Sequence, residues 1–140
     1  MFALHKRVKF YETDGMQVVH HANYLRWFEE ARVEYLRAGG VLLNDLMKEG
    51  IVFPIVEVSC KYLMPARYDD EVTVKTWLRQ VDRVKLVFEY EVVRDRDGAV
   101  LTKGSTTGTY TSIAKGRIVR MPKEQLAKLV AISSEDREGT

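Results

Sequence analysis

An early stretch of helical periodicity constrains the fold most strongly. Past Asn23, large or small apolar residues recur at steps of four, three, four and three, which places them on one face of a helix: Tyr24, Phe28, Ala31, Tyr35 and Ala38. Charged residues occupy a different face: Glu30, Glu34 and Arg37. Gly39 and Gly40 favour a helix end here, because a left-handed cap carries no Cβ penalty in glycine. Asn23 is a suitable N-cap. The pattern predicts a helix of about 18 residues, roughly 27 Å long.

After residue 50 the period changes from helix to strand. Apolar and polar side chains alternate over residues 56–64, 72–79 and 84–92, and a β-branched run follows at 100–113. Asp95–Gly98 is a typical hairpin turn. Shorter predicted elements are a first strand at 4–11, a second helix at 41–50, a strand at 117–119 and a terminal helix at 122–130. This order predicts one α+β domain over residues 1–140, with a polar, frayed tail at 131–140.

Composition excludes several classes of protein. The 140 residues, 46% hydrophobic and 30% charged, suit one soluble domain with one core. The net charge of +2 comes from 22 basic and 20 acidic residues that are interspersed, so no broad nucleic-acid footprint is expected, although a local anion site is possible. The sequence has no membrane-spanning apolar run and no signal-peptide core, which predicts a cytoplasmic protein. Cys60 has no disulfide partner and is predicted to be a small buried hydrophobe.

The sheet that these strands predict has long edges. Such edges need a cover or a partner strand, because unpaired N–H and C=O groups invite pairing with another chain. We therefore expect the chain to pair with a second copy of itself.

The chemically interesting residues lie just before the long helix. Backbone N–H groups at a helix start carry partial positive charge and can stabilise an oxyanion. Asp14 precedes the helix by a few residues, and an aspartate carboxylate is ionised at neutral pH. It can act as a nucleophile or general base toward an acyl carbon held at those N–H groups. Taken alone, Asp14 fits equally well as a turn or capping residue.

The run YETDGMQVVHHANYLRWFEEAR, residues 11–32, resembles the signature of the 4-hydroxybenzoyl-CoA thioesterase-like hotdog family, which includes acyl-CoA thioesterases linked to the bacterial Tol-Pal system. The resemblance rests on the spacing of Asp14, His21, Asn23 and Tyr24. It continues through PARYDDEV and the later strands to about residue 122. It implies a hotdog fold, in which an antiparallel sheet of five or six strands wraps one long central helix. It also implies hydrolysis of fatty or aromatic acyl-CoA without a cofactor, in a homodimer or homotetramer.

The resemblance implies roles for individual residues. In the family, the residue matching Asp14 is the catalytic carboxylate, and the backbone amide of the residue matching His21 binds the thioester oxygen. The His21 ring can also orient Asp14 or a water. His20, Asn23 and Tyr24 are expected around the substrate. From the residues themselves, Arg83 and Lys85 share a strand face near a turn, where they can bind coenzyme A phosphates or simply face solvent.

Several alternatives remain at this stage. Glu29 and Glu30 are the runner-up catalytic residues, since related hotdog enzymes use a carboxylate from this helix. A noncatalytic acyl-binding or assembly module and a hotdog dehydratase are the competing functions. The adjacent histidines and Cys60 lack metal-ligand spacing, so no metal is expected. The run Gly104–Gly108 lacks the central serine of a nucleophile elbow, and no phosphate-binding or dinucleotide motif occurs.

Overall fold

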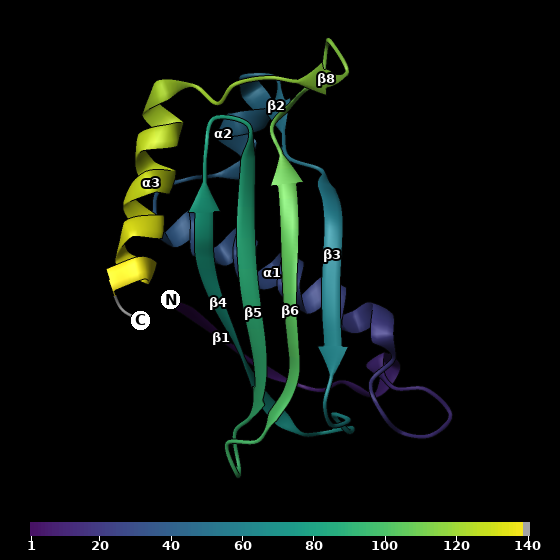
Figure 1. Ribbon diagram of the computed structural model, residues 1–140. Coiled ribbons are helices and arrows are strands. Elements are labelled where there is room, and N and C mark those ends of the chain that lie inside the picture. Colours follow the sequence, from purple (N-terminus) through teal and green to yellow (C-terminus); the bar gives the residue numbers. More distant parts are fainter. Residues whose placement is uncertain (139–140) are drawn as a thin grey trace.

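The computed structural model describes residues 1–138, with side chains described through residue 136. Its main sheet has five antiparallel strands in the order β1-β4-β5-β6-β3 (Figure 1). Their bounds are β1 Phe2–Arg7, β3 Ile55–Tyr62, β4 Glu71–Val81, β5 Lys85–Arg94 and β6 Val100–Thr109. A smaller antiparallel sheet joins β2 Ile51–Val52, β7 Thr111–Ser112 and β8 Arg117–Ile118. The α+β architecture predicted from the order of elements is confirmed, with five strands in the main sheet.

The long helix α1, His21–Ala38, begins three residues earlier than an N-cap at Asn23 predicts. Its N-cap is His20, whose ring Nδ1 accepts a hydrogen bond from the Ala22 N–H at 3.2 Å, so the prediction of Asn23 as the cap was wrong. The helix ends as expected, with Gly40 in the left-handed region at φ 86°. A short helix α2, Leu43–Lys48, follows. None of the helices in residues 1–138 has the length and apolarity needed to cross a bilayer.

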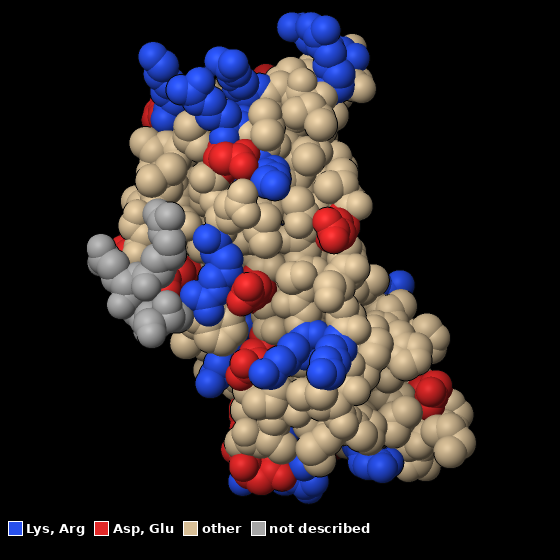
Figure 2. All heavy atoms as spheres, in the orientation of Figure 1, with Lys and Arg blue, Asp and Glu red and all other residues tan. Residues whose placement is uncertain are grey.

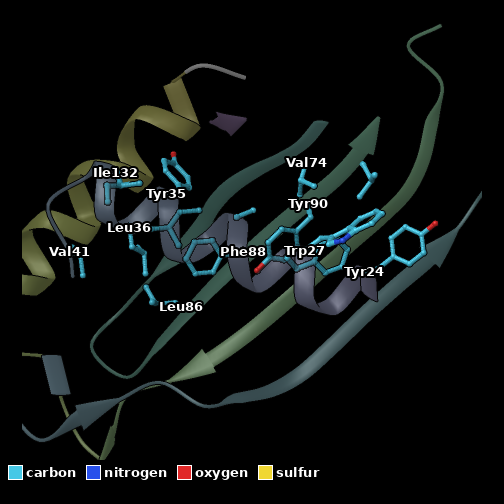
Figure 3. Close-up of a cluster of buried hydrophobic side chains, with 14 of the residues drawn as sticks. Tyr24, Trp27, Tyr35, Leu36, Val41, Val74, Leu86, Phe88, Tyr90 and Ile132 are labelled. Atoms are coloured by element: carbon cyan, nitrogen blue, oxygen red, sulfur yellow. The ribbon is translucent and has the colours of Figure 1, made fainter. Parts of the chain in front are cut away.

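The core lies between α1 and the main sheet (Figure 3). The predicted helix face is buried at Tyr24, Phe28, Ala31 and Tyr35, whereas Ala38 in the last turn is exposed. The Phe28 ring stacks on the Tyr90 ring of β5, with 4.2 Å between their centroids. Packing of this face against the sheet, rather than helix propensity, therefore holds α1 in place.

A third helix, α3 Lys123–Glu138, replaces most of the frayed tail predicted at 131–140. The prediction failed because a few residues of this mostly polar stretch pack against the rest of the protein and are buried: Ile132, Ser133 and Asp136. The Asp136 carboxylate accepts hydrogen bonds from the Tyr35 hydroxyl at 2.5 Å and from the Leu78 N–H at 2.6 Å. Since β1 pairs with β4 no further than Thr76, α3 covers the rest of that edge. Residues 139–140 lie outside the described part of the chain.

The opposite edge of the sheet is formed by β3, which has only β6 beside it. The predicted apolar face of this strand exists but is open to solvent in the single chain, with Val56 61% and Val58 45% exposed. Cys60 is only half-buried, so its prediction as a buried residue was wrong. The reason is its position in the sheet, because an edge strand lacks the neighbours that cover an inner one.

A substitution at Gly104 of β6 would test how closely α1 packs on the sheet. A Cβ added at Gly104 would lie 2.6 Å from Cε2 of Phe28 and 3.0 Å from the Ser59 carbonyl oxygen. Gly104→Ala should therefore push Phe28 away from Tyr90 and lower the free energy of unfolding by about 1–3 kcal/mol, measured by chemical denaturation. Gly15→Ala is the control, since nothing lies within 4 Å of its added Cβ. Equal stability of the two variants would contradict this packing.

Candidate active site

The segment between the short 3-10 turn η1, Phe10–Glu12, and α1 is a closed loop. Its base is joined by a bridge between Thr13 and Val19, and by the His20 N–H, which donates to the Glu12 carbonyl at 2.9 Å. Gln17 has φ 64°, a left-handed conformation that costs energy for a residue other than glycine. The loop therefore has a defined backbone, and it holds Asp14 just before α1.

The Asp14 carboxylate is exposed on this loop. Its Oδ1 accepts the Met16 N–H at 2.8 Å, a turn contact of the kind that aspartate commonly makes. Within the part of the chain that the structure describes, no donor contacts its Oδ2. Asp14 is thus both a turn residue and a carboxylate with one oxygen available for chemistry.

The backbone N–H groups at the start of α1 differ in whether the protein supplies an acceptor. The Ala22 N–H donates to the His20 ring, and the Asn23 N–H donates to the His20 carbonyl at 3.0 Å. The His21 N–H has no acceptor among residues 1–138. Because it lies at the positive end of the helix, it is suited to bind a developing oxyanion.

A hollow of about 230 Å³ opens beside the start of α1. Its lining comes from the Asp14 loop, from α1 and from the end of β3 and the residues after it: Val18, Val19, His21, Tyr24, Tyr62, Leu63, Met64 and Pro65. The Tyr62 ring lies 4.8 Å from the His21 ring and 5.3 Å from the Tyr24 ring, centroid to centroid. The lining is mostly apolar, which suits an acyl group whose carbonyl reaches the helix start.

Two tyrosines and a cysteine at or near the hollow, Tyr62, Tyr24 and Cys60, have raised pKa values and stay protonated at neutral pH. Burial, together with a hydrogen bond to the Cys60 thiol, raises the pKa of Tyr62 to about 12. Burial also raises the pKa of Tyr24, against the opposing hydrogen bond from the Ala66 N–H, and raises the pKa of the Cys60 thiol. Cys60 is therefore a poor nucleophile here, because the thiolate is the reactive form.

Glu12 is a buried residue of the site that the sequence patterns missed. Its Oε2 accepts the Trp27 Nε1–H at 2.6 Å, and its Oε1 accepts the Lys9 N–H at 2.8 Å. Its carbonyl oxygen accepts the Asn23 Nδ2–H at 2.7 Å in addition to the His20 N–H. No spacing rule connects Glu12 with Trp27, and the only signal was its place within the YETD run.

The structure brings most of the predicted site residues together, in different roles. Tyr24 and His21 line the hollow, while His20 caps α1. Asn23 is buried and holds the Glu12 carbonyl, and Oδ1 of Asn23 accepts a hydrogen bond from Arg26 at 3.3 Å. Asn23 therefore shapes the site from beneath and does not line the hollow.

Arg83 and Lys85 lie elsewhere. The Asp14 loop touches the chain just before β4, through the bridge between Val18 and Arg67, whereas Arg83 follows the end of this strand (Figure 1). The 11 residues of β4 span about 36 Å. A single chain therefore does not place Arg83 or Lys85 beside Asp14.

The runner-up carboxylates also lie away from the hollow. Glu30 forms an ion pair with the Lys6 ammonium at 2.5 Å. Glu29 lines a different hollow of about 240 Å³, formed by α1, α2 and the β2 region. Neither of these carboxylates lines the hollow at the start of α1, whereas Asp14 belongs to the loop that contributes Val18 and Val19 to its lining.

Comparisons with known proteins identify the family of this chain. Residues 8–129 match the family model described as the thioesterase-like superfamily. The chain is 32% identical over 124 residues to the acyl-CoA thioesterase YbgC of Haemophilus influenzae, covering 88% of this chain and 90% of that one. The crystal structure of a hypothetical protein of Aquifex aeolicus is 36% identical, with a TM-score of 0.85 over 92% of this chain and 99% of that one. A DHNA-CoA thioesterase of Staphylococcus aureus is 27% identical, with a TM-score of 0.91 over 99% and 95% of the two chains. The chain belongs to the thioesterase-like superfamily of hotdog fold.

Proposed function

We propose that this protein is a cytoplasmic acyl-CoA thioesterase, which hydrolyses a fatty or aromatic acyl-CoA to the free acid and coenzyme A. Two observations support the proposal: one oxygen of the exposed Asp14 carboxylate has no donor among residues 1–138, and the His21 N–H is free at the start of α1, where an apolar hollow opens. The relative from Haemophilus influenzae is named for the same reaction.

The chemistry needs few groups. The thioester carbonyl oxygen accepts the His21 N–H, and this donor stabilises the oxyanion that forms as the carbonyl carbon is attacked. Asp14 supplies the attack, either directly through Oδ2 or by taking a proton from a water molecule. The C–S bond then breaks, and the thiolate of coenzyme A leaves and takes a proton from solvent. On the direct route, water then hydrolyses the anhydride between the acyl group and Asp14, which frees the acid. Because a thiolate is a good leaving group, a carboxylate and a backbone donor are chemically sufficient.

The backbone of His21 suits the oxyanion better than its ring does. The N–H direction is fixed by the helix, so it needs no reorganisation as charge develops. The ring packs at a tilt against Tyr62, where it forms part of the wall of the hollow. The ring therefore positions the acyl group and water, and the amide binds the oxygen.

The competing functions fit the structure less well. A hotdog dehydratase abstracts a proton with a histidine and a carboxylate placed differently, and related hotdog enzymes use a carboxylate from this helix. Glu30 is engaged by Lys6, and Glu29 faces the other hollow, so the helix offers no carboxylate beside His21. A noncatalytic acyl-binding module would need the hollow but not the available Asp14 oxygen.

Removing the Asp14 carboxylate should abolish turnover and leave the fold intact. Asp14→Ala should lose about 10³-fold in thiol release from acyl-CoA, roughly 4 kcal/mol of transition-state stabilisation, with little change in melting temperature. Asp45→Ala is the matched control, since Asp45 is also exposed but lies on α2. Near-normal turnover by Asp14→Ala, or failure of the native chain on every acyl-CoA in a broad panel, would contradict the proposal.

The open face of β3 supports a second part of the proposal, that the protein is a homodimer or homotetramer. The exposed apolar residues on and after this strand are Val56, Val58, Tyr62, Leu63 and Met64. An unpaired edge with an apolar face is a natural pairing surface. Tyr62, Leu63 and Met64 also line the catalytic hollow, so a second copy at β3 would enclose the site.

Light scattering tests this assembly directly. The native chain should have a mass of at least twice 16.2 kDa. Val58→Asp should lower the mass toward that of one chain, because a buried charge opposes pairing. Val130→Asp on α3, where the valine is also 41% exposed, is the control and should leave the mass unchanged. A native monomer across the working concentrations would contradict the assembly.

A further inference from the structure

One end of the molecule, distant from Asp14, is strongly basic. Five exposed cationic residues gather there from the β4–β5 turn, the β7–β8 hairpin and the start of α3: Arg83, Lys115, Arg117, Arg120 and Lys123. Figure 2 shows Lys and Arg side chains concentrated at the top of the molecule, over the end where Figure 1 shows β8 and the beginning of α3. We call these five residues, with the apolar residues between them, the basic end.

Backbone hydrogen bonds hold the basic end together as one surface. The Tyr110 N–H donates to the Val84 carbonyl at 3.0 Å, and the Met121 N–H donates to the Arg83 carbonyl at 3.1 Å. The Val119 N–H donates to the Tyr110 carbonyl at 2.9 Å, and β7 pairs with β8. The three contributing segments are therefore fixed relative to one another.

The cations of the basic end are not neutralised by the protein. Within residues 1–136, none of the five cationic head groups forms an ion pair or a hydrogen bond with another residue. The adjacent Asp82 carboxylate is occupied by the N–H groups of Val84 and Lys85, and the nearby Glu124 approaches Lys128 at 4.0 Å. The surface therefore carries excess positive charge that an anionic partner can neutralise.

Large aliphatic side chains are exposed between these cations. Ile113 is 56%, Ile118 55% and Val84 40% exposed. The two isoleucines flank the tip of the projecting β7–β8 hairpin, together with Lys115 and Arg117. A convex tip with aliphatic residues ringed by cations fits the boundary between lipid headgroups and acyl chains. There the aliphatic side chains leave water, and the cations contact headgroup phosphates.

We propose that the basic end docks the protein onto an anionic lipid bilayer. The five cations contact the headgroup phosphates, while Ile113 and Ile118 enter the interfacial layer. Juxtamembrane cations are attracted to anionic leaflets with a strength that falls within a Debye length. Nucleic acid fits this surface less well. Proteins bind nucleic acid bases with polar or aromatic side chains, whereas the exposed residues between these cations are aliphatic.

The basic end lies away from the candidate active site of the same chain. In the single chain, the Asp14 loop and the hollow lie beyond the other end of β4, so the basic end of that chain can contact a bilayer without covering them (Figure 1). This proposal does not depend on the proposed thioesterase activity. Binding to a bilayer can be measured whether or not the chain cleaves thioesters.

The test is co-sedimentation of the full chain with vesicles of phosphatidylcholine alone or mixed with phosphatidylglycerol. Binding should require the anionic lipid and weaken strongly between about 0.05 M and about 0.5 M salt. Arg117→Gln with Arg120→Gln should weaken binding about 25-fold, since each cation near an anionic surface contributes about 5-fold. Arg96→Gln with Lys103→Gln, which removes two exposed cations elsewhere, should leave binding within about 2-fold. Ile118→Ser should weaken the binding that persists at high salt.

Three results would overturn the proposal. The first is equal sedimentation with the two kinds of vesicle. The second is an equal loss of vesicle binding in the two double variants, which would mean that binding depends on the net charge of the protein and not on the basic end. The third is absence of vesicle binding while Ile118→Ser lowers the mass measured by light scattering, which would make the basic end a contact between copies of the chain. Circular dichroism of each variant confirms that the fold is kept.

Discussion

The candidate active site depends on the hydrogen bonds that hold the buried side chain of Glu12. One of its oxygens is bound by the Trp27 indole from within α1, and the other by the Lys9 N–H at the start of η1. A buried carboxylate needs such donors, and each hydrogen bond to a charged group contributes about 1.5–3 kcal/mol. Its carbonyl oxygen takes the Asn23 side chain and the His20 N–H. One residue thereby fixes the Asp14 loop on the first turns of the helix.

Because Glu12 holds the loop in place, the proposed reaction needs only a few groups. With the loop fixed, Asp14 has one oxygen in a turn contact and one available, and His20 caps the helix so that the next N–H is left for a ligand. Neither group is unusual alone. Their value comes from a loop and a helix start that are held in place and from the apolar hollow that His21 lines, because electrostatic stabilisation works best where donors are already oriented. Residues away from the chemistry, such as Glu12 and Asn23, contribute through that rigidity.

Local patterns in the sequence predicted local features well. The period of α1 identified its buried face, and the spacing of Asp14, His21 and Tyr24 indicated the candidate site proposed above. Features that depend on distant contacts were missed. Glu12 is buried by Trp27, 15 residues away, and α3 is held by Asp136, which contacts Tyr35 across 101 residues. The exposure of Val58 follows from the place of β3 in the sheet, which alternation cannot indicate. The basic end joins Arg83 with a segment more than thirty positions later, so interspersed charges in the sequence form a patch only after folding.

The most direct test of the account is whether the His21 amide binds the acyl oxygen. The measurement is the amide proton and nitrogen shift of His21 in the isotope-labelled full chain, with and without an acyl-CoA analogue in which a methylene replaces the thioester sulfur. Such a ketone keeps the carbonyl oxygen and cannot be cleaved. We predict a downfield shift of the His21 amide proton on binding, larger than that of Ala22, whose N–H is already occupied by the His20 ring. If the analogue binds while the His21 amide stays unchanged and only the imidazole resonances move, the oxyanion is not held at the start of α1 and the account is wrong.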